Sequence, residues 1–494
     1  MKRLNTRSMA QLPARVGRPA YSLDSVPIGV VHLGVGNFFR AHQAVYLDEA
    51  MSLGETGWGV CGVSLRNAAT RDALQPQDGL YTLIERDGAG DRARIVGSLR
   101  ELLVARENPG QVVTRMAAPG TRWISLTITE KGYGHLGGSG NRLDLDNPDI
   151  AHDLAAPRAP RSALGLLHAT ALKRRLDGAG ALTVLSCDNL SCNGDLLRAL
   201  LLEFDAAAGG GAAGWIADHL FFPNTMVDRI VPHTTDVERR LAMDLLGVED
   251  AWPVATEAFR QWVVEDRFAG PRPQLEQLGV QIVADVRPFE AMKLRLLNAA
   301  HSALAWLAVP AGLETVDQAI AQPDLCRFIE AMWHDEVIPG LPAEVRSAAP
   351  AYCDGLLARF GNPALAHRTA QIAMDGSQKL PLRVLPSIRA NLDSGLPIER
   401  LALVVAAWIN YLGGVGEAGR RFQPDDPLRD LIHDAGHASA SPDAARMIVG
   451  RHGIFGDLAG HRGLVQEVGK WLERLRLQGS IASVAALRTP RTHP

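Results

Sequence analysis

The sequence lacks the features that mark nucleic-acid-binding, secreted and membrane-spanning proteins. Aromatic residues make up 5% of the 494 residues, charged residues 21%, and the formal net charge is only −3. A chain so nearly neutral offers no concentrated basic surface to a phosphate backbone, so we expect no nucleic-acid partner. The basic N-terminus is followed by no apolar signal region, which predicts a cytoplasmic protein. The most apolar stretch, Leu401 to Leu412, contains Asn410 and is too short to cross a bilayer, which favours a buried helix and no membrane partner.

Cysteine is also scarce. The chain has five cysteines, an odd number, and no CxxC pair. Neither a disulfide framework nor a thiolate zinc site is therefore indicated, and no other set of Cys, His and Glu stands at ligand spacing. We expect reduced, packed cysteines and no metal.

No internal repeat is present, and the two parts of the chain differ in pattern. Short apolar runs alternate with amphipathic stretches in the first part, which is typical of an α/β protein with a sheet buried on both faces. After residue 288, helical patterns follow one another with only Pro and Gly between them. We predict an α/β domain over residues 1–287, closed by a last strand within 280–288, and an all-α domain over 288–494. The runs expected as strands are 28–33, 58–63, 80–85, 123–127 and 182–186.

A glycine pair follows the first of these runs. Gly34 and Gly36 lie between the strand and a helical pattern, and Asn37 and Phe38 open the helix. This order lets backbone N–H groups approach a pyrophosphate, as in a Rossmann-type dinucleotide-binding domain. The third glycine of that fingerprint is replaced by Phe39, so the motif alone also fits a plain strand-to-helix turn. Its position at the start of an α/β region favours the dinucleotide site.

In a Rossmann-type domain, a side chain at the end of the second strand normally contacts the ribose of the cofactor. After Val63 no acidic residue follows directly, and Arg66 and Arg71 are close by. An acidic residue at this place would favour NAD, and an arginine would favour NADP. We include Arg66 in the cofactor site. We expect NAD as the cofactor, and NADP stays open.

The segment from Pro288 to Ser302 carries the strongest chemical signal. On a regular α-helix, His301 lies about 80° and Asn298 about 140° around the axis from Lys293, among apolar residues. A lysine that loses hydration has a lowered pKa and can accept a proton near neutral pH, as alcohol oxidation requires. The carboxamide of Asn298 can stabilise the resulting oxyanion. The same residues could instead be a solvent-reaching lysine and a satisfied core network.

Two further segments follow apolar strands, where open α/β sheets place ligand contacts. The first contains Glu130, a candidate for proton transfer, and the second contains Asp188 and Asn189, of which Asn189 is a candidate oxyanion donor. Asp188 fits equally well as a turn former. A third segment places Asp228 beside Arg229, which suggests either a substrate contact or a structural ion pair.

Taken together, these strings resemble the mannitol dehydrogenase family of long-chain polyol dehydrogenases, which includes mannitol 2-dehydrogenases and fructuronate reductases. The resemblance runs from GVGNFFRAHQA through SLTITEKGY, SCDNLSCNG, FPNTMVDRIVP and MKLRLLNAAHS to QIAMDGSQKLP. It implies a Rossmann-type N-terminal domain, a helical C-terminal domain, a metal-free active site in the cleft between them, and a monomer.

The resemblance also implies residue roles. Lys293 would be the general acid/base, Asn189 and Asn298 the oxyanion clamp, and His301 would orient the substrate oxygen. Glu130 would assist proton transfer, and the substrate would be bound by Asp228 and by Lys379 of the DGSQK string.

Two departures leave the substrate open between a sugar alcohol and a sugar acid. Ala69 stands where NAD-preferring mannitol enzymes can carry an aspartate, and Gln371 stands where they carry an arginine. The residues around Gln371 are more similar to the fructuronate reductase branch, whereas the N-terminal third is more similar to the mannitol branch. A zinc-dependent polyol dehydrogenase and a non-catalytic NAD-binding regulator are the alternative classes.

Overall fold

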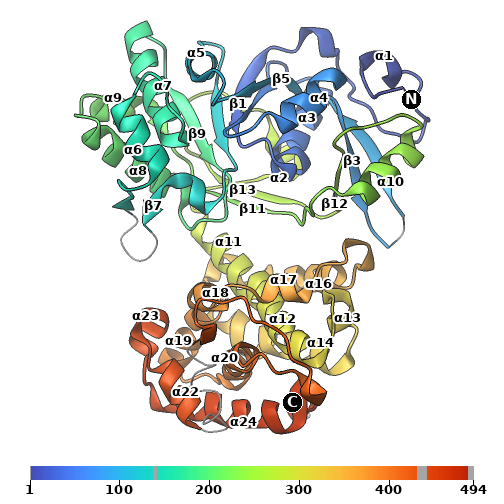
Figure 1. The fold of residues 1–494 in the computed structure, drawn as a ribbon, viewed down its shortest axis with the longest axis vertical. Coiled ribbons are helices and arrows are strands. Elements are labelled where there is room, and N and C mark those ends of the chain that lie inside the picture. Colours follow the sequence, from blue (N-terminus) through green and yellow to red (C-terminus); the bar gives the residue numbers. More distant parts are fainter. Residues whose placement is uncertain (1, 89, 137–141, 431–441, 488–494) are drawn as a thin grey trace. The chain divides into compact units, whose positions relative to one another are not determined.

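The computed structural model describes residues 2–88, 90–136, 142–430 and 442–487 (Figure 1). Contacts divide the chain into two compact units, Met1–Arg287 and Pro288–Pro494. The first is an α/β unit and the second is helical.

The first unit is built on a six-stranded sheet of order β10-β9-β6-β1-β2-β5, in which every neighbouring pair is parallel. Alternate residues of β1 (Ile28–Leu33) enter two different cores. Val31 and Leu33 pack with α5 (Pro109–Ala117), α7 (Ala163–Asp177) and α8 (Asn193–Ala207), while Val30 packs with α3 (Gln43–Ser52). The sheet is thus buried on both faces, as predicted. Its strands are β1 (Ile28–Leu33), β2 (Gly59–Ser64), β5 (Leu99–Val104), β6 (Trp123–Leu126), β9 (Leu182–Ser186) and β10 (Leu220–Phe221).

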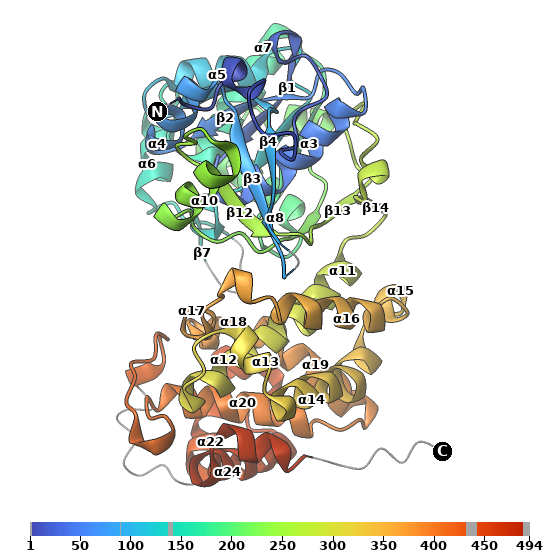
Figure 2. The same ribbon diagram turned by 90° about the vertical axis from the view of Figure 1, so that its right-hand side faces the viewer.

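The run predicted as a strand over 80–85 forms β3 (Tyr81–Arg86), but it does not join the main sheet. It pairs antiparallel with β4 (Arg92–Val96), as the long hairpin in Figure 2 shows, and parallel with β12 (Val254–Glu257). A second small sheet has the order β11-β13-β14 and comprises β11 (Thr225–Asp228), β13 (Gln261–Glu265) and β14 (Gln281–Val283), the last strand expected within 280–288. A third pairs β7 (His135–Leu136) with β8 (Arg142–Leu143).

Helices connect these strands. Several begin with a side-chain cap, such as Ser162 before α7 and Thr235 before α10. Their bounds are α1 (Thr6–Met9), α2 (Asn37–Ala41), α3 (Gln43–Ser52), α4 (Ala69–Leu74), α5 (Pro109–Ala117), α6 (Pro148–Ala155), α7 (Ala163–Asp177), α8 (Asn193–Ala207), α9 (Ala213–His219) and α10 (Asp236–Leu246). Helix α11 (Arg287–Met292) leads into the second unit.

The second unit packs helices around α12 (Ala299–Ala311) and α20 (Glu399–Leu412). The stretch Leu401 to Leu412, predicted as a buried helix, lies within α20 and is buried except at Asn410. The other helices are α13 (Val316–Ile320), α14 (Pro323–Ala331), α15 (Ala343–Arg346), α16 (Ala349–Phe360), α17 (Thr369–Ala373), α18 (Gly376–Arg383), α19 (Leu385–Ser394), α22 (Pro442–Val449), α23 (His452–Phe455) and α24 (Arg462–Ala485).

Two segments of this unit form π-helix. They are η5 (Lys293–Asn298) and η6 (Met332–Val337). The prediction of a regular α-helix from residue 288 onward is therefore wrong over η5. Its hydrogen bonds join residues five apart, so the predicted angles around the helix do not apply there.

Candidate active site

The glycine turn after β1 has the geometry of a nucleotide-binding loop. Gly34 has φ +97°, and a Cβ atom there would lie 2.2 Å from the carbonyl oxygen of Thr127, so only glycine fits. Gly36 is different, because its φ is −84° and a Cβ atom would meet nothing nearer than 3.9 Å. Packing within the protein does not require glycine at position 36. The space in front of it is open at the start of α2, where a pyrophosphate would need close approach to the backbone.

A buried histidine fixes this turn, and the sequence analysis missed it. His32 Nε2 lies 3.1 Å from the Gly34 carbonyl oxygen, and His32 Nδ1 lies 2.8 Å from Ser125 Oγ. Because a carbonyl only accepts, Nε2 carries the proton and the serine hydroxyl donates to Nδ1. Burial lowers the pKa of His32 to about 3, so the ring is neutral. A histidine inside the apolar run IGVVHL was the available signal.

Asn37 and Phe38 open α2, as predicted, but their side chains make contacts within the protein. The Asn37 amide donates to Pro232 O and to Thr234 Oγ1, each at 3.1 Å, and Phe38 stacks on His42. Only the backbone of these two residues is therefore assigned to the candidate nucleotide site.

Arg66 follows β2, as predicted, and its side chain is exposed. The second arginine, Arg71, is occupied by Asp72 and Glu107. Arg66 is consequently the arginine at this strand end that makes no ion pair within the described part of the chain.

The segments after β6 and β9 lie at the same edge of the sheet, because these strands are parallel neighbours. Asp188 joins them: its carboxylate accepts from the backbone N–H groups of Ile128 at 3.0 Å and Thr129 at 2.9 Å, and from the Tyr133 hydroxyl at 2.8 Å. Thr129 has φ +65°, a strained value for a β-branched residue, and Glu130 follows it. Asp188 thus fixes the segment that carries Glu130 and lies next to Asn189 in sequence. Glu130 and Asn189 are both exposed at this edge.

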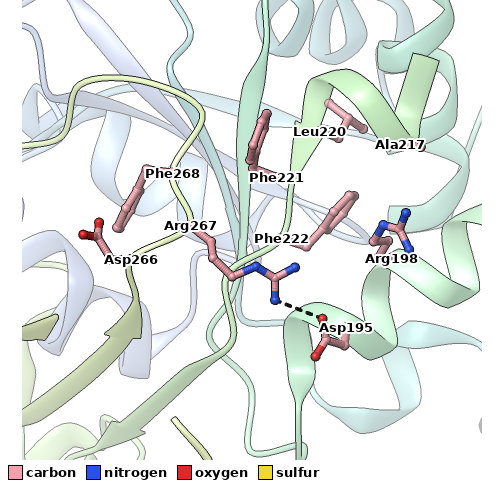
Figure 3. A pocket seen from close by; sticks show the side chains of 9 residues that line it. All are labelled: Asp195, Arg198, Ala217, Leu220, Phe221, Phe222, Asp266, Arg267 and Phe268. Carbon is pink, nitrogen blue, oxygen red and sulfur yellow. Dashed lines mark hydrogen bonds and ion pairs between the residues drawn. The ribbon is translucent and has the colours of Figure 1, made fainter. Parts of the chain in front are cut away.

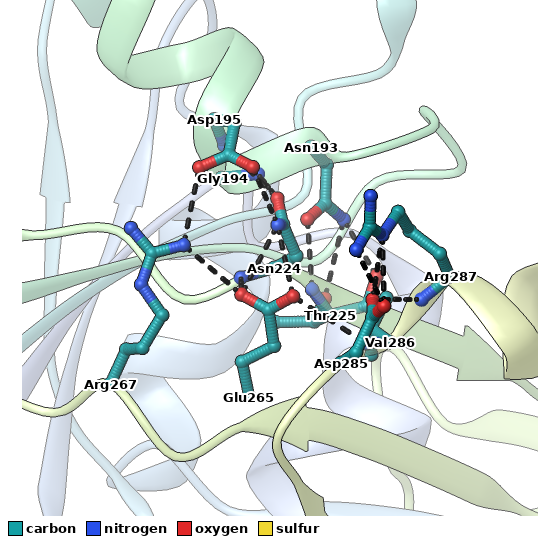
Figure 4. A network of polar contacts seen from close by, with 10 residues as sticks. All are labelled: Asn193, Gly194, Asp195, Asn224, Thr225, Glu265, Arg267, Asp285, Val286 and Arg287. Carbon is teal, nitrogen blue, oxygen red and sulfur yellow. Dashed lines mark hydrogen bonds and ion pairs between the residues drawn. The ribbon is translucent and has the colours of Figure 1, made fainter.

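Asp228 lies at the end of β11 and is buried. Its neighbour Arg229, predicted as a possible partner, forms an ion pair with Glu85 at 2.6 Å. A polar network holds the start of β11 (Figure 4). Asn193 Nδ2 donates to the carbonyls of Asp188 and Thr225, each at 3.0 Å. The segment that carries Asn189 is thereby tied to the strand that ends at Asp228.

Asn224 extends the same network. Its Oδ1 accepts from the Gly194 and Asp195 N–H groups at the start of α8, and its Nδ2 donates to Glu265. These contacts explain why the SCNG and FPNT strings contain asparagines that the sequence analysis did not interpret.

In the second unit, Lys293 and His301 are buried, with relative exposures of 8% and 9%. Both belong to one continuous helical segment with Asn298, in which η5 leads into α12. The His301 ring contacts the rings of Phe360 and His367 at centroid distances of 4.6 and 5.3 Å. Burial, and then the nearby His367, Arg359 and Arg383, lower the pKa of His301 well below its usual value. His301 Nε2 has no hydrogen-bond partner in the part of the chain that the structure describes.

Lys379 lies in α18, and its amine is bonded by backbone oxygens. Nζ donates to Ile372 O at 3.1 Å and to Met374 O. Burial and the nearby Arg383 lower its pKa to about 8. Gln371 lies in the preceding helix, α17, and is exposed.

A separate groove of about 460 Å³ lies in the first unit (Figure 3). It is lined by Phe221, Phe222 and Phe268, and by the ion pair of Asp195 with Arg267. None of the predicted site residues lines it, so the groove is not the candidate site.

The described residues contain neither a metal-ligand cluster nor a membrane-spanning helix. Among the described residues, no group of three or more His, Cys, Asp and Glu side chains could hold a metal ion. Over the same residues, no helix combines the length and the apolar character needed to span a membrane.

A doubly covered parallel sheet, with an open glycine turn after its first strand, defines a dinucleotide-binding α/β protein. The comparisons give the family. The model of the mannitol dehydrogenase Rossmann domain matches residues 28–277, and that of the mannitol dehydrogenase C-terminal domain matches residues 285–476. The chain belongs to the mannitol dehydrogenase family, so the predicted resemblance and fold class are confirmed.

Similarity extends over the whole length of the chain. Mannitol 2-dehydrogenase from Phaeosphaeria nodorum is 40% identical over 490 residues, which are 98% of this chain and 85% of that protein. The enzyme of the same name from Pyricularia oryzae is 40% identical over 98% of both chains.

Two solved structures share the fold. The Pseudomonas fluorescens mannitol 2-dehydrogenase, in a ternary complex with NAD and D-mannitol, is 37% identical with a TM-score of 0.85 and covers 98% of this chain and 99% of its own. A substrate-free D-sorbitol dehydrogenase is 32% identical with a TM-score of 0.91 and covers 97% of this chain and 100% of its own.

Proposed function

We propose that this protein is a metal-independent, NAD-dependent dehydrogenase that interconverts a polyol and a ketose of the mannitol and fructose type. The observation that carries this proposal is the full-length similarity to mannitol 2-dehydrogenases, one of which is known in complex with NAD and D-mannitol. The domain boundary near residue 287 is part of the same proposal.

The first unit fits a dinucleotide. Gly34 allows the tight turn, Gly36 leaves the space that a pyrophosphate would fill, and the backbone N–H groups of Asn37 and Phe38 lie at the start of α2. Arg66 would contact the ribose end. When bound, NAD supplies the acceptor for hydride from the alcohol carbon.

The protein's own residues would handle the proton and the reacting oxygen. Lys293 Nζ, which is buried, would accept the hydroxyl proton during oxidation and return it during reduction. The carboxamides of Asn189 and Asn298 would donate to the alkoxide-like oxygen. His301, with a neutral ring, would orient that oxygen through a hydrogen bond.

Three further residues would complete the site. Glu130, exposed beside the strained Thr129, would pass the proton to water. Asp228 would accept hydrogen bonds from substrate hydroxyls, and Lys379 would bind the substrate once its amine leaves the backbone oxygens that hold it.

One observation favours a second candidate, a fructuronate reductase acting on the fructuronate and mannonate pair. Arg359, Arg383 and His367 all lie close enough to His301 to affect its pKa. The two guanidinium groups, Arg359 and Arg383, would suit a carboxylate better than a neutral hydroxyl chain.

The test is a panel of initial rates with D-mannitol, D-fructose, D-arabinitol and D-fructuronate, each with NAD(H) and NADP(H), before and after treatment with a chelator. We expect turnover of mannitol and fructose with NAD(H) that is unaffected by chelation. Turnover of fructuronate alone would assign the second candidate. Binding of NADH without any turnover would indicate a regulatory protein, and loss of activity on chelation would indicate a metal enzyme.

The role of Lys293 is tested by Lys293→Ala, with Lys173→Ala as the matched control because Lys173 is a half-buried residue of α7 that pairs with Asp177. We expect kcat to fall about 10²- to 10⁴-fold in the first variant, as for loss of a general base, with NADH binding unchanged. Wild-type turnover in Lys293→Ala would refute the assignment.

A further inference from the structure

The π-helical form of η5 places Lys293 and Asn298 on nearly the same side of the helix. The N–H of Ala299 reaches back to Leu294 O, five residues earlier, and also to Leu296 O. Bonding between residues five apart gives side chains with that spacing a similar direction around the helix, and Lys293 and Asn298 have this spacing. In an α-helix the two would be about 140° apart. The conformation of this turn therefore decides whether the amine and the carboxamide can act on one oxygen.

The local sequence does not favour this conformation. The segment KLRLLN consists mainly of good α-helix formers, and π turns are rare and usually limited to a single turn. A π turn in such a sequence needs bonds from elsewhere in the fold to hold it.

Trp333 provides such a bond. Its indole Nε1–H donates to Leu296 O at 3.1 Å, and the side chain is fully buried. Trp333 belongs to η6, the second π-helix, which is itself fixed because Glu336 accepts from the N–H groups of Arg400 and Leu401 at the start of α20. The indole is thus held firmly against the middle of η5.

The end of η5 has a second support. Arg383 donates to Ser302 Oγ at 3.0 Å and lies 3.4 Å from Asn298 O. Because α12 is buried from Ala299 to Pro310, the helix after η5 is held against rotation that would restore a regular α turn. Loss of the hydrogen bond from Trp333 would therefore make η5 less ordered, but it would not turn η5 into a regular α-helix.

We propose that Trp333 is a positioning residue for the proton-transfer step: its hydrogen bond to Leu296 O keeps η5 in the π form that aligns Lys293 with Asn298. This inference rests on the proposed function of Lys293.

The test compares Trp333→Phe with Trp471→Phe. Both remove the same atoms from a buried indole, but Trp471 Nε1 has no hydrogen-bond partner within the described residues. For Trp333→Phe we expect kcat to fall about tenfold, as for one lost hydrogen bond, with KM for the polyol and the Kd of NADH within twofold of wild type. The apparent pKa of the pH–rate profile should also shift. Trp471→Phe should change none of these.

A readout without substrate separates this proposal from the function on which it rests. Acetylation of Lys293 by acetic anhydride, followed against pH by mass spectrometry in the cofactor-free protein, reports the titration of its amine. We expect a shifted profile in Trp333→Phe and a wild-type profile in Trp471→Phe.

The outcomes are distinct. Equal behaviour of the two variants in kcat, pH profile and acetylation would overturn the proposal. If Lys293→Ala keeps wild-type turnover, the proposed function fails, yet the acetylation profile still reports whether Trp333 holds η5. Should Trp333→Phe not fold, replacing Trp333 with β-(3-benzothienyl)alanine exchanges the indole N–H for sulfur at nearly constant shape and gives the same comparison.

Discussion

The two glycines after β1 should respond to alanine in opposite ways. At Gly34, φ is +97° and the added Cβ atom would lie 2.2 Å from Thr127 O, a backbone atom that cannot move independently. The positive φ alone costs about 1–3 kcal/mol, and displacement of the segment after β6 adds to it. At Gly36, φ is −84° and the added atom would meet nothing nearer than 3.9 Å, so alanine should leave the free energy of unfolding unchanged or raise it by up to about 1 kcal/mol.

The Gly36→Ala variant should lose affinity for the cofactor although it keeps its stability. In Gly36→Ala the methyl group occupies the space assigned to the pyrophosphate, and we expect NADH binding to weaken about tenfold or more, which corresponds to about 1.4 kcal/mol. Urea unfolding and fluorescence titration of NADH measure the two quantities on the same protein. If Gly36→Ala were as stable as wild type and bound NADH with wild-type affinity, the space in front of Gly36 would not be the cofactor site.

Two further variants test the surroundings of the site. In Asp188→Asn the amide can accept only one of the two N–H bonds from Ile128 and Thr129, so we expect kcat to fall and the free energy of unfolding to drop by about 1–3 kcal/mol; a loss of stability with unchanged kcat would make Asp188 purely structural. Burial raises the pKa of Glu336 to about 7 from 4.5, although two N–H groups and Arg400 favour its charged form. The folded protein therefore keeps a proton that the unfolded chain releases between these values, so the contribution of Glu336 to stability is greatest below pH 4.5 and is lost as the pH rises toward 7, by about 3 kcal/mol at most. Urea unfolding at several pH values should show this dependence in wild type and not in Glu336→Gln; the same slope in both would refute it.

The sequence predicted the strands of the first unit well, because a sheet buried on both faces needs continuous apolar runs. All five predicted runs are strands. The sequence could not predict that β3 lies outside the main sheet. An apolar run indicates that a strand is buried, but it does not indicate which strand pairs with it. The pairing of β3 with β12 joins residues far apart in the chain.

The same limit applies to the candidate site. The glycine turn could be predicted because Gly34 and Gly36 stand between a strand and a helix at the start of an α/β region. The roles of His32 and Trp333 could not be predicted, because each depends on a hydrogen bond to a carbonyl oxygen that only the folded structure reveals. The π-helix over Lys293 to Asn298 was missed because its residues are ordinary α-helix formers.

The strand order of the first unit has a consequence for how the chain folds. The central strand β1 pairs on one side with β6, where the His32 side chain meets Ser125, 93 residues later. The edge strand β10 comes only at Leu220–Phe221. Parallel pairings over such separations form slowly, because a long loop must close before any contact stabilises it. During synthesis at the ribosome, β1 and β2 should therefore remain an open apolar ribbon until β6 has emerged, and this interval is when the nascent chain is most exposed to aggregation and most in need of a chaperone.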